Sequence, residues 1–465
     1  MNSTLLINLK LQGIILFLAA IMFSCNQPAN STEEIVSEKQ PYVFSTPEWS
    51  KNANIYEVNI RQYTKEGTFR AFESHLPRLQ NMGVKILWLM PIYPIGEKNR
   101  KGSLGSYYAV KDYKAVNPEF GTLEDFKSLV KKAHEMGFKV ILDWVANHTA
   151  WDNQWIYNHP EWYSKDSLGN MVSPFDWSDV ADLNYDEKSL WDAQIDALKF
   201  WVTEADVDGY RCDVAGMVPL EFWEKARYEL DQIKPVFMLA EAEEVAHHEK
   251  SFDMSYAWEL HHIFNKIAKG EKNANDLEAY FYKNDTAYPL HAYRMAFITN
   301  HDENSWNGTV TERMGEGGEA FTVLTYTLPG MPLIYSGQEV GLNKRLEFFE
   351  KDQIDWDDSS PLILFYSKLN QLKNNQKALW NGEYGSPMIR IKTTNDEDVF
   401  AFIRGEGIDQ IFTIVNLSDD IIETTFSGGD HFGSYQEYFS GEEITWDGKT
   451  TVSLQPWEYR VYLSK

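Results

Sequence analysis

The chain has 465 residues and carries 43 Lys and Arg against 69 Asp and Glu, which gives a formal net charge of −26. This excess of negative charge disfavours nucleic acid or an anionic membrane surface as a partner. Aromatic residues make up 14% of the chain, which argues against disorder and suits stacking on flat ligands. We expect a globular protein of two or three units, at least one with an extensive core.

Residues 1–25 have the pattern of an export signal, in which a short apolar run ends at Phe23 and is followed by Ser24-Cys25. The pattern resembles a bacterial lipoprotein signal. That resemblance implies a lipid on Cys25, which would be the only membrane contact and would place the protein on the cell envelope. Phe23 departs from the small residue usual at its position, so ordinary secretion is the alternative. Residues 26–44 are polar and indicate a flexible tether.

From about Asn54 the chain alternates short apolar runs with amphipathic helical stretches, the pattern of parallel β/α architecture. Eight such units occur without a glycine-rich dinucleotide fingerprint after the first strand, so we predict a closed (β/α)8 barrel, an α/β TIM barrel. The helical stretches include Leu123–Met136, which Gly137 should end, and Ser189–Glu204. The predicted strands are Ile55–Ile60, Val84–Met90, Lys139–Trp144, Val207–Asp213, Val236–Ala240, Phe252–Tyr256, Arg294–Thr299 and Pro332–Tyr335.

The predicted barrel occupies residues 45–380 and has one interruption. About forty residues after the third strand lack a convincing helix, and loops of that length are usually functional. We interpret residues 149–186 as a small inserted domain over the strand ends. After the last barrel helix, predicted over Leu362–Leu379, alternating runs are separated by Gly, Asn and Asp, so residues 381–465 should form an antiparallel β-sandwich.

Four motifs fall at the C-terminal ends of predicted strands, where a barrel places its chemistry. Arg211 and Asp213 are two residues apart, so on a strand both side chains leave the same face, whereas Cys212 between them should be a buried free thiol. Arg211 with Asp213 could be a structural ion pair, and a lone His or Asp at a strand end is more often a structural hydrogen-bonding group, but four such motifs together favour an active site. The motifs are Asp143 with Asn147 and His148, Arg211 with Asp213, Glu241, and Asn300-His301-Asp302.

Convergent carboxylates with aromatic residues and His, without a cluster of metal-ligand spacing, fit glycosidic bond cleavage best. A retaining glycosidase needs one carboxylate as nucleophile and a protonated second carboxyl group as acid, about 5 to 5.5 Å away. The runs DWVANH, GYRCD, the Glu after FMLA, and FITNHD occur in this order and closely resemble the four signature regions of the α-amylase superfamily of glycoside hydrolases. The resemblance spans residues 45–465 and implies that family's barrel, inserted domain and C-terminal sandwich.

The resemblance also implies a role for each matching residue. Asp213 would be the nucleophile, held and kept ionised by Arg211. Glu241 would be the acid/base, with a pKa that its surroundings raise.

The remaining matches imply contacts with the sugar. Asp302 would bind sugar hydroxyls and support the transition state together with His148 and His301. Tyr108 would stack on the ring at the cleaved bond.

The sequence departs from the family at its calcium site. Many α-amylases follow the nucleophile with a Lys-His pair, whose His helps to hold a structural calcium, but here Val214-Ala215-Gly216-Met217 follow Asp213. Asn147, another calcium ligand in the family, would then only brace its loop. The first loop, Arg61–Thr68, also lacks the run of Asp and Asn that an oxygen-ligand site needs. We expect no required metal or other cofactor, with calcium as the alternative.

The sequence therefore predicts an exported, lipid-anchored enzyme that cleaves α-1,4-glucosidic bonds in starch-type glucans or maltooligosaccharides with retention. An α-glucan transglycosylase is the alternative, because a sugar hydroxyl can replace water with the same catalytic residues. A catalytically inactive glucan-binding homologue would be expected to lack one of the three carboxylates, and all three are present.

Overall fold

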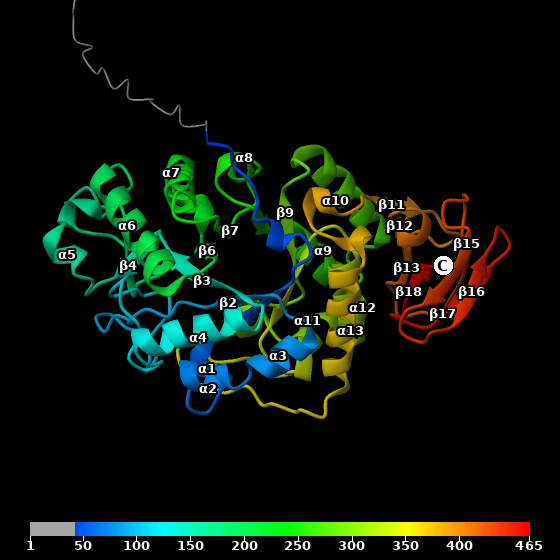
Figure 1. The fold of residues 1–465 in the computed structure, drawn as a ribbon, viewed down its shortest axis with the longest axis horizontal. Helices are drawn as coiled ribbons and strands as arrows, with labels where there is room; N and C mark the ends of the chain where they lie inside the picture. Colours follow the sequence, from blue (N-terminus) through cyan, green and yellow to red (C-terminus); the bar gives the residue numbers. More distant parts are fainter. Residues whose placement is uncertain (1–41) are drawn as a thin grey trace, which may run out of the picture. The chain divides into compact units, whose positions relative to one another are not determined.

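The computed structural model describes residues 42–465 (Figure 1). The predicted signal, its Cys25 and nearly all of the predicted tether lie outside the described residues. Among residues 42–465 no helix is both long enough and apolar enough to cross a membrane.

Eight parallel strands close into a barrel, which confirms the predicted fold class. Neighbouring strands follow the order β1-β10-β9-β8-β7-β6-β3-β2 around the ring. Six of the eight strands are shorter than predicted, because buried apolar residues continue beyond the last ladder hydrogen bond, as at Phe297 and Ile298. The barrel strands are β1 Ile55–Val58, β2 Ile86–Leu89, β3 Lys139–Val145, β6 Gly209–Asp213, β7 Phe237–Ala240, β8 Met254–Tyr256, β9 Tyr293–Ala296 and β10 Met331–Tyr335.

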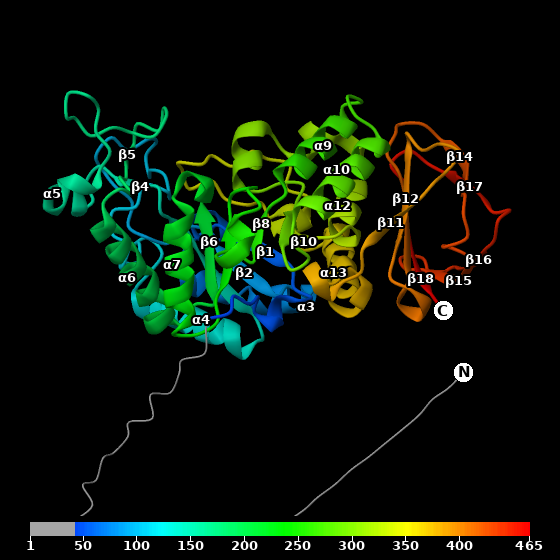
Figure 2. The same cartoon turned by 90° about the horizontal axis from the view of Figure 1, so that it is seen from above.

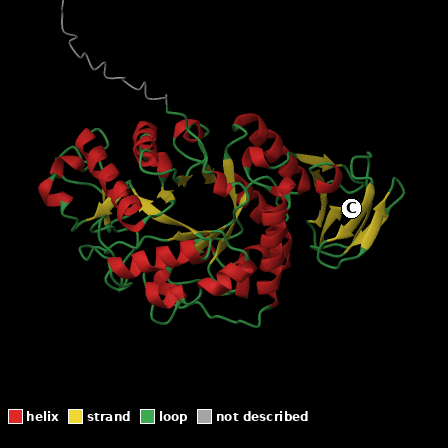
Figure 3. Ribbon diagram, in the orientation of Figure 1, coloured by secondary structure: helices red, strands yellow, loops and turns green. Residues whose placement is uncertain are grey.

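Helices surround the ring of strands (Figure 3). The predicted helix that ends at Gly137 is α4, where Thr122 and Asp125 form a capping box and Gly137 has a φ of +87°. Further helices are α1 Ile60–Tyr63, α2 Phe69–Glu73, α3 Leu76–Met82, α4 Leu123–Glu135, α5 Trp155–Asn158, α6 Lys188–Ala205, α7 Leu220–Asp231, α8 His247–Lys250, α9 Trp258–Ala268, α10 Ala274–Ala287, α11 Val310–Met314, α12 Gly318–Thr327 and α13 Pro361–Asn375.

Seven of the eight barrel strands contribute apolar side chains to one buried cluster, which includes Ile55, Trp88 and Met295. The strand that contributes none is β6, where Arg211 is fully buried. The register pairs Asp143 of β3 with Arg211 of β6. These two charged side chains therefore lie beyond the apolar cluster, toward the C-terminal ends of the strands. The barrel therefore has an apolar interior with one buried guanidinium at its edge.

The segment after β3 contains two short antiparallel strands, β4 His148–Ala150 and β5 Val180–Asp182, and the short helix α5. The C-terminal region forms antiparallel sheets, as the alternation predicts (Figure 2). Its six-stranded sheet has the order β11-β12-β13-β18-β15-β16, and β14 pairs with β17. These strands are β11 Met388–Ile391, β12 Val399–Arg404, β13 Ile411–Asn416, β14 Ile422–Thr425, β15 Gly433–Glu437, β16 Glu443–Trp446, β17 Thr451–Leu454 and β18 Tyr459–Ser464.

The C-terminal sheets are joined to the barrel helices through buried contacts. Arg404 Nη1 donates hydrogen bonds to the carbonyl oxygens of Thr327 and Leu328, at 3.2 and 2.9 Å. Phe400 and Phe402 belong to the same buried cluster as helical side chains such as Phe321. These contacts fix the end of α12, the helix that precedes β10.

Candidate active site

The four predicted motifs meet at one cavity of about 530 Å³ at the C-terminal ends of the barrel strands. That volume lies within the usual range for a small-molecule site. Arg211 lies below the cavity and is fully buried. The predicted side chains that line the cavity are Tyr108, His148, Asp213, Glu241, His301 and Asp302.

Arg211 holds the carboxyl groups together. Its Nη1 donates to Asp143 Oδ1 and to Asp213 Oδ1, each at 2.9 Å. Its Nη2 lies 2.9 Å from Glu241 Oε2, which is an ion-pair distance although the N–H is not aimed at that oxygen. Because a buried guanidinium is costly unless it is paired, these carboxyl groups and Arg211 stabilise one another. Asp213 and Glu241 are therefore neighbours on one guanidinium.

Burial raises the pKa of Asp213 and of Glu241, and Arg211 acts against burial in both. The charges of Glu241 and Asp143 add to the rise at Asp213, and the charge of Asp302 adds to the rise at Glu241. We expected Arg211 to keep Asp213 ionised, but in the free site burial outweighs that attraction. The carboxyl groups around Arg211 therefore titrate as a coupled set, because one guanidinium cannot compensate all of them.

The turn after the nucleophile candidate is strained. Val214 has φ +37° and ψ +45°, in the left-handed region that a β-branched residue rarely adopts. Its N–H donates to Glu241 Oε2 at 2.7 Å. Strain of this kind costs on the order of 1–3 kcal/mol and is concentrated at functional sites. Through this hydrogen bond Val214 connects the end of β6 to Glu241, the residue that follows β7.

His301 connects β1 to the cavity. Its Nδ1 lies 2.5 Å from Glu57 Oε1, and its Nε2 lies 2.9 Å from the Tyr108 hydroxyl and 3.3 Å from Asp302 Oδ2. Burial alone would lower the pKa of His301, but the charges of Asp302 and Glu57 outweigh burial and raise that pKa to about 9. His301 is therefore an imidazolium at neutral pH, with Tyr108 stacked on its ring at 5.5 Å between centroids.

Sequence reasoning missed Glu57, which is fully buried on β1. The signal was present, since a charged residue in the otherwise apolar strand Ile55–Val58 needs a partner. That partner, His301, is 244 positions away in the sequence.

His148 contributes an uncharged ring to the cavity. Burial lowers the pKa of His148 to about 3. Its ring meets the ring of Trp177 edge-on at 5.5 Å, which attaches the inserted segment to the end of β3. His148 can therefore accept or donate one hydrogen bond without adding charge.

A π-helix, η4 Glu303–Asn307, begins directly after Asp302. Such turns are rare and often occur at functional sites. It places Trp306 at the cavity with 53% of its surface exposed, next to Phe348 at 5.4 Å and Phe349 at 5.8 Å between ring centroids. Sequence reasoning missed these three aromatic residues, because their loops carry no periodic pattern.

The family model described as "Alpha amylase, catalytic domain" matches residues 40–410. The chain belongs to the α-amylase family. It is a glycoside hydrolase of the amylase type.

Individual relatives agree with the family assignment. The structure is similar to the noncanonic maltogenic α-amylase AmyB of Thermotoga neapolitana, with a TM-score of 0.79 and 30% identity over 90% of this chain and 97% of AmyB. The α-amylase MalA of Haloarcula japonica is 29% identical over 83% of this chain and 58% of MalA, so the chain spans little more than half of that relative. An α-1,4-glucan:maltose-1-phosphate maltosyltransferase of Salinibacter ruber is 27% identical over 81% of this chain and 61% of that enzyme.

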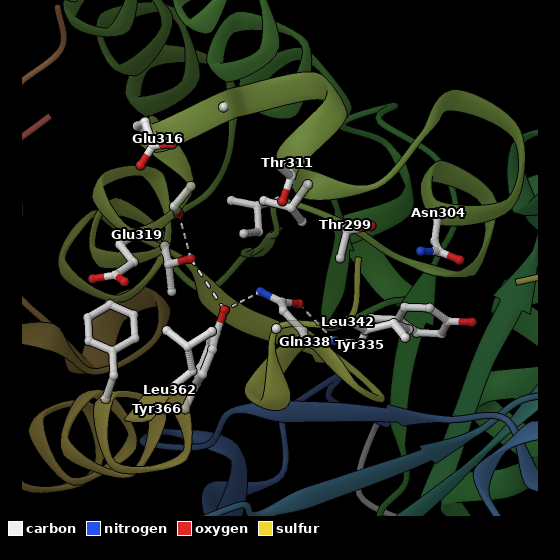
Figure 4. A pocket seen from close by; sticks show the side chains of 17 residues that line it. Thr299, Asn304, Thr311, Glu316, Glu319, Tyr335, Gln338, Leu342, Leu362 and Tyr366 are labelled. Carbon is white, nitrogen blue, oxygen red and sulfur yellow. Dashed lines mark hydrogen bonds between the residues drawn. The ribbon is translucent and has the colours of Figure 1, made fainter. Parts of the chain in front are cut away.

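A second cavity, of about 240 Å³, lies between α11, α12 and α13 and the ends of β9 and β10 (Figure 4). Along its wall Gln338 Nε2 donates to the Tyr366 hydroxyl at 2.7 Å. Its two carboxylates, Glu316 and Glu319, are exposed and have no guanidinium between them. The chemistry that the family requires is therefore assigned to the larger cavity.

The calcium site of the family does not fit this chain. Among residues 42–465 no group of three or more His, Cys, Asp or Glu could hold a metal ion. Asn147, the family ligand that is retained, has its Nδ2 3.3 Å from His148 Nδ1. Calcium takes six to eight oxygen ligands, and the run Val214-Ala215-Gly216-Met217, which follows Asp213 here, has no His and no side-chain oxygen.

Proposed function

We propose that the protein hydrolyses α-1,4-glucosidic bonds of starch-type glucans or maltooligosaccharides with retention of anomeric configuration. One observation carries the proposal: Asp213 and Glu241 both lie 2.9 Å from the guanidinium of Arg211, on the floor of the cavity that Asp302 and His301 also line. Two neighbouring carboxyl groups and a third carboxylate near the sugar are what a retaining glycosidase needs.

In the first step Asp213 attacks the anomeric carbon, and Glu241 donates its proton to the departing glycosidic oxygen. In the second step Glu241 takes a proton from water, whose oxygen replaces Asp213 on the same carbon. Burial raises the pKa of Glu241, and a raised pKa favours the protonated form that the first step needs. Asp213 must be ionised to attack, and its hydrogen bond from Arg211 favours that form.

Asp302 and His301 stabilise the transition state in this proposal. The side chain of Asp302 is about one-third exposed at the cavity, so it can accept hydrogen bonds from sugar hydroxyls. The imidazolium of His301 adds a charged donor, and Tyr108 offers a ring face to the sugar.

The alternative is an α-glucan transglycosylase, favoured by the similarity to the maltosyltransferase of Salinibacter ruber. Product analysis separates the two activities. The protein is incubated with maltoheptaose, starch and pullulan, and the products are followed by chromatography and by NMR of the new anomeric centre. Hydrolysis gives only shorter sugars with the α configuration, whereas transfer gives longer ones as well. β-Configured first products, or no cleavage of any substrate, would contradict the proposal.

We also propose that the protein is exported and attached to the cell envelope by a lipid on Cys25. The proposal rests on the sequence of residues 1–25. Mass spectrometry of the membrane fraction should find an acylated N-terminus at Cys25, and Cys25→Ala should release the protein. A mature soluble form that begins elsewhere would contradict the anchor and support ordinary secretion.

A further inference from the structure

The loop after β2, residues 97–105, spans the space between two other loops, and we call it the β2 loop. On one side it contacts the inserted segment: Lys101 Nζ lies 3.1 Å from Asp179 Oδ1, and the Glu97 N–H donates to Asp152 Oδ2 at 3.1 Å. The β2 loop is therefore joined to the segment that follows β3.

On its other side the β2 loop contacts the loop after β10. The Ser103 N–H donates to Glu350 Oε1 at 2.7 Å, and the Leu104 N–H donates to the Phe349 carbonyl oxygen at 3.2 Å. Gly102, with φ +63°, comes so close that a Cβ there would lie 2.4 Å from Phe349 Cβ. Only glycine fits that approach without a shift of the chain. The two loops thus touch along their backbones.

The base of the β2 loop is also fixed. Buried Arg61 donates to the carbonyl oxygens of Gly105 and Leu104, at 3.1 and 3.3 Å. The β2 loop, the inserted segment and the loop after β10 consequently form one continuous wall. Members of all three line the catalytic cavity: Lys101, Asp179, Phe348 and Phe349.

The barrel order shows which end of a glucan meets this wall. Glu241, which would protonate the departing oxygen, follows β7, and β7 stands opposite β1 in the closed ring. The strands that flank β1 are β2 and β10, which carry the wall. The departing part of the glucan must leave past Glu241. The retained part therefore points toward the wall, along the rings of Tyr108, Phe348 and Trp306.

We infer that this wall closes the cavity at the non-reducing end of the substrate, so that the enzyme removes short units from glucan ends and does not cut within long chains. The inference rests on the proposed α-1,4-glucan hydrolysis and names its substrate class. A chain that continued past the wall would have to separate Lys101 from Asp179 and Ser103 from Glu350.

The test uses two chromogenic maltoheptaosides that differ only in whether the non-reducing end is free or carries an ethylidene block. The intact protein should cleave the free substrate with a kcat/KM at least about tenfold higher than the blocked one, a difference of about 1.4 kcal/mol. Equal rates on the two substrates would overturn the inference and leave the proposed hydrolysis standing. Failure to cleave either substrate would overturn both.

A double variant, Lys101→Ala with Glu350→Ala, removes one contact on each side of the β2 loop. It should reduce the difference in kcat/KM between the two substrates, whereas Lys131→Ala, at an exposed position of α4 outside the cavity lining, should leave that difference unchanged. If the double variant does not fold, the wild-type protein still decides the matter on amylose. Early products limited to short sugars, with little loss of viscosity, support the wall, and a rapid fall in viscosity overturns it.

Discussion

Glu57 and His301 come from opposite ends of the barrel sequence and meet inside it, with Oε1 of the first 2.5 Å from Nδ1 of the second. The second carboxyl oxygen of Glu57 is buried and has no hydrogen-bond partner. The carboxylate therefore has His301 as its one hydrogen-bond partner. Glu57 does not reach the cavity, so we regard it as a residue that positions His301 and keeps it charged.

Glu57→Gln should remove that charge and lower the pKa of His301 from about 9 toward its ordinary value. At pH 8 the variant would then have a neutral His301 and lose a charged donor to the substrate or to Asp302. We expect its KM on maltoheptaose to rise several-fold at pH 8 relative to wild type, with a smaller rise at pH 6. An equal rise at both values would mean that Glu57 serves only to pack the barrel.

Variants of the two catalytic carboxyl groups, Asp213 and Glu241, should differ in their kinetics. Asp213→Ala should abolish turnover on every substrate, because no group remains to form the glycosyl-enzyme. Glu241→Gln should be nearly as damaging on starch, whose leaving oxygen needs a proton. It should still form the covalent intermediate from an α-glucosyl fluoride, because fluoride leaves unprotonated. Mass spectrometry of the trapped enzyme measures the intermediate, and near-normal starch hydrolysis by Glu241→Gln would reverse the assignment.

The barrel and its motifs could be predicted from the sequence because both depend on local patterns. Eight apolar runs alternate with amphipathic helices, and Arg211 and Asp213 share a strand face through their spacing. The wall could not be predicted in this way. Its contacts join residues 103 and 350, and 101 and 179, across loops whose course no periodicity determines. The protonation of Asp213 also depends on burial and on neighbours from other strands, which a motif does not reveal.

A second buried carboxylate, Glu339, should be important for stability. Its Oε1 accepts hydrogen bonds from the Tyr56 hydroxyl at 2.5 Å and from Arg78 Nη2 at 2.9 Å, and its Oε2 accepts one from the Gly337 N–H. Glu339→Ala would leave a buried hydroxyl and a mostly buried guanidinium without their acceptor, which should cost about 3–5 kcal/mol. Urea denaturation measures the loss.

The exposed carboxylate of Glu316 provides the control for that measurement. Glu316→Ala should change the free energy of unfolding by less than about 0.5 kcal/mol. A loss at Glu339→Ala as small as that of the control would mean that water replaces the missing acceptor.

Chelation should have little effect on stability. The family's Lys-His pair is absent after Asp213, where Val214-Ala215-Gly216-Met217 stand, and the Asn147 amide lies 3.3 Å from His148 Nδ1. After dialysis against EDTA we expect Tm to change by no more than a degree or two. A site that is exposed to calcium at 100 times its Kd would add about 2.7 kcal/mol to the free energy of unfolding. Removing that calcium would therefore lower Tm measurably. A large fall in Tm that calcium restores would show that other oxygen ligands hold the ion.

The buried ring of His148 should make stability fall with acidity. Its pKa is about 3 in the folded protein and near 6.5 when unfolded, because burial opposes the charged form. Below pH 6.5 His148 binds a proton in the unfolded chain but not in the folded protein. This group therefore lowers the free energy of unfolding by up to about 1.4 kcal/mol per pH unit as the pH falls from 6.5 toward 3.

His148→Gln removes that titration and keeps a polar side chain of similar reach. As the pH falls from 6 to 4, the free energy of unfolding of this variant should decrease less steeply than that of the wild type. The difference in slope should be up to about 1.4 kcal/mol per pH unit, which corresponds to one proton. Asn158→Gln, which exchanges one uncharged amide for another at an exposed position of the inserted segment, should keep the wild-type slope. Urea denaturation at several pH values measures both slopes. Parallel curves for His148→Gln and wild type would mean that the ring takes up its proton in the folded state, and that solvent reaches the floor of the cavity beside Trp177.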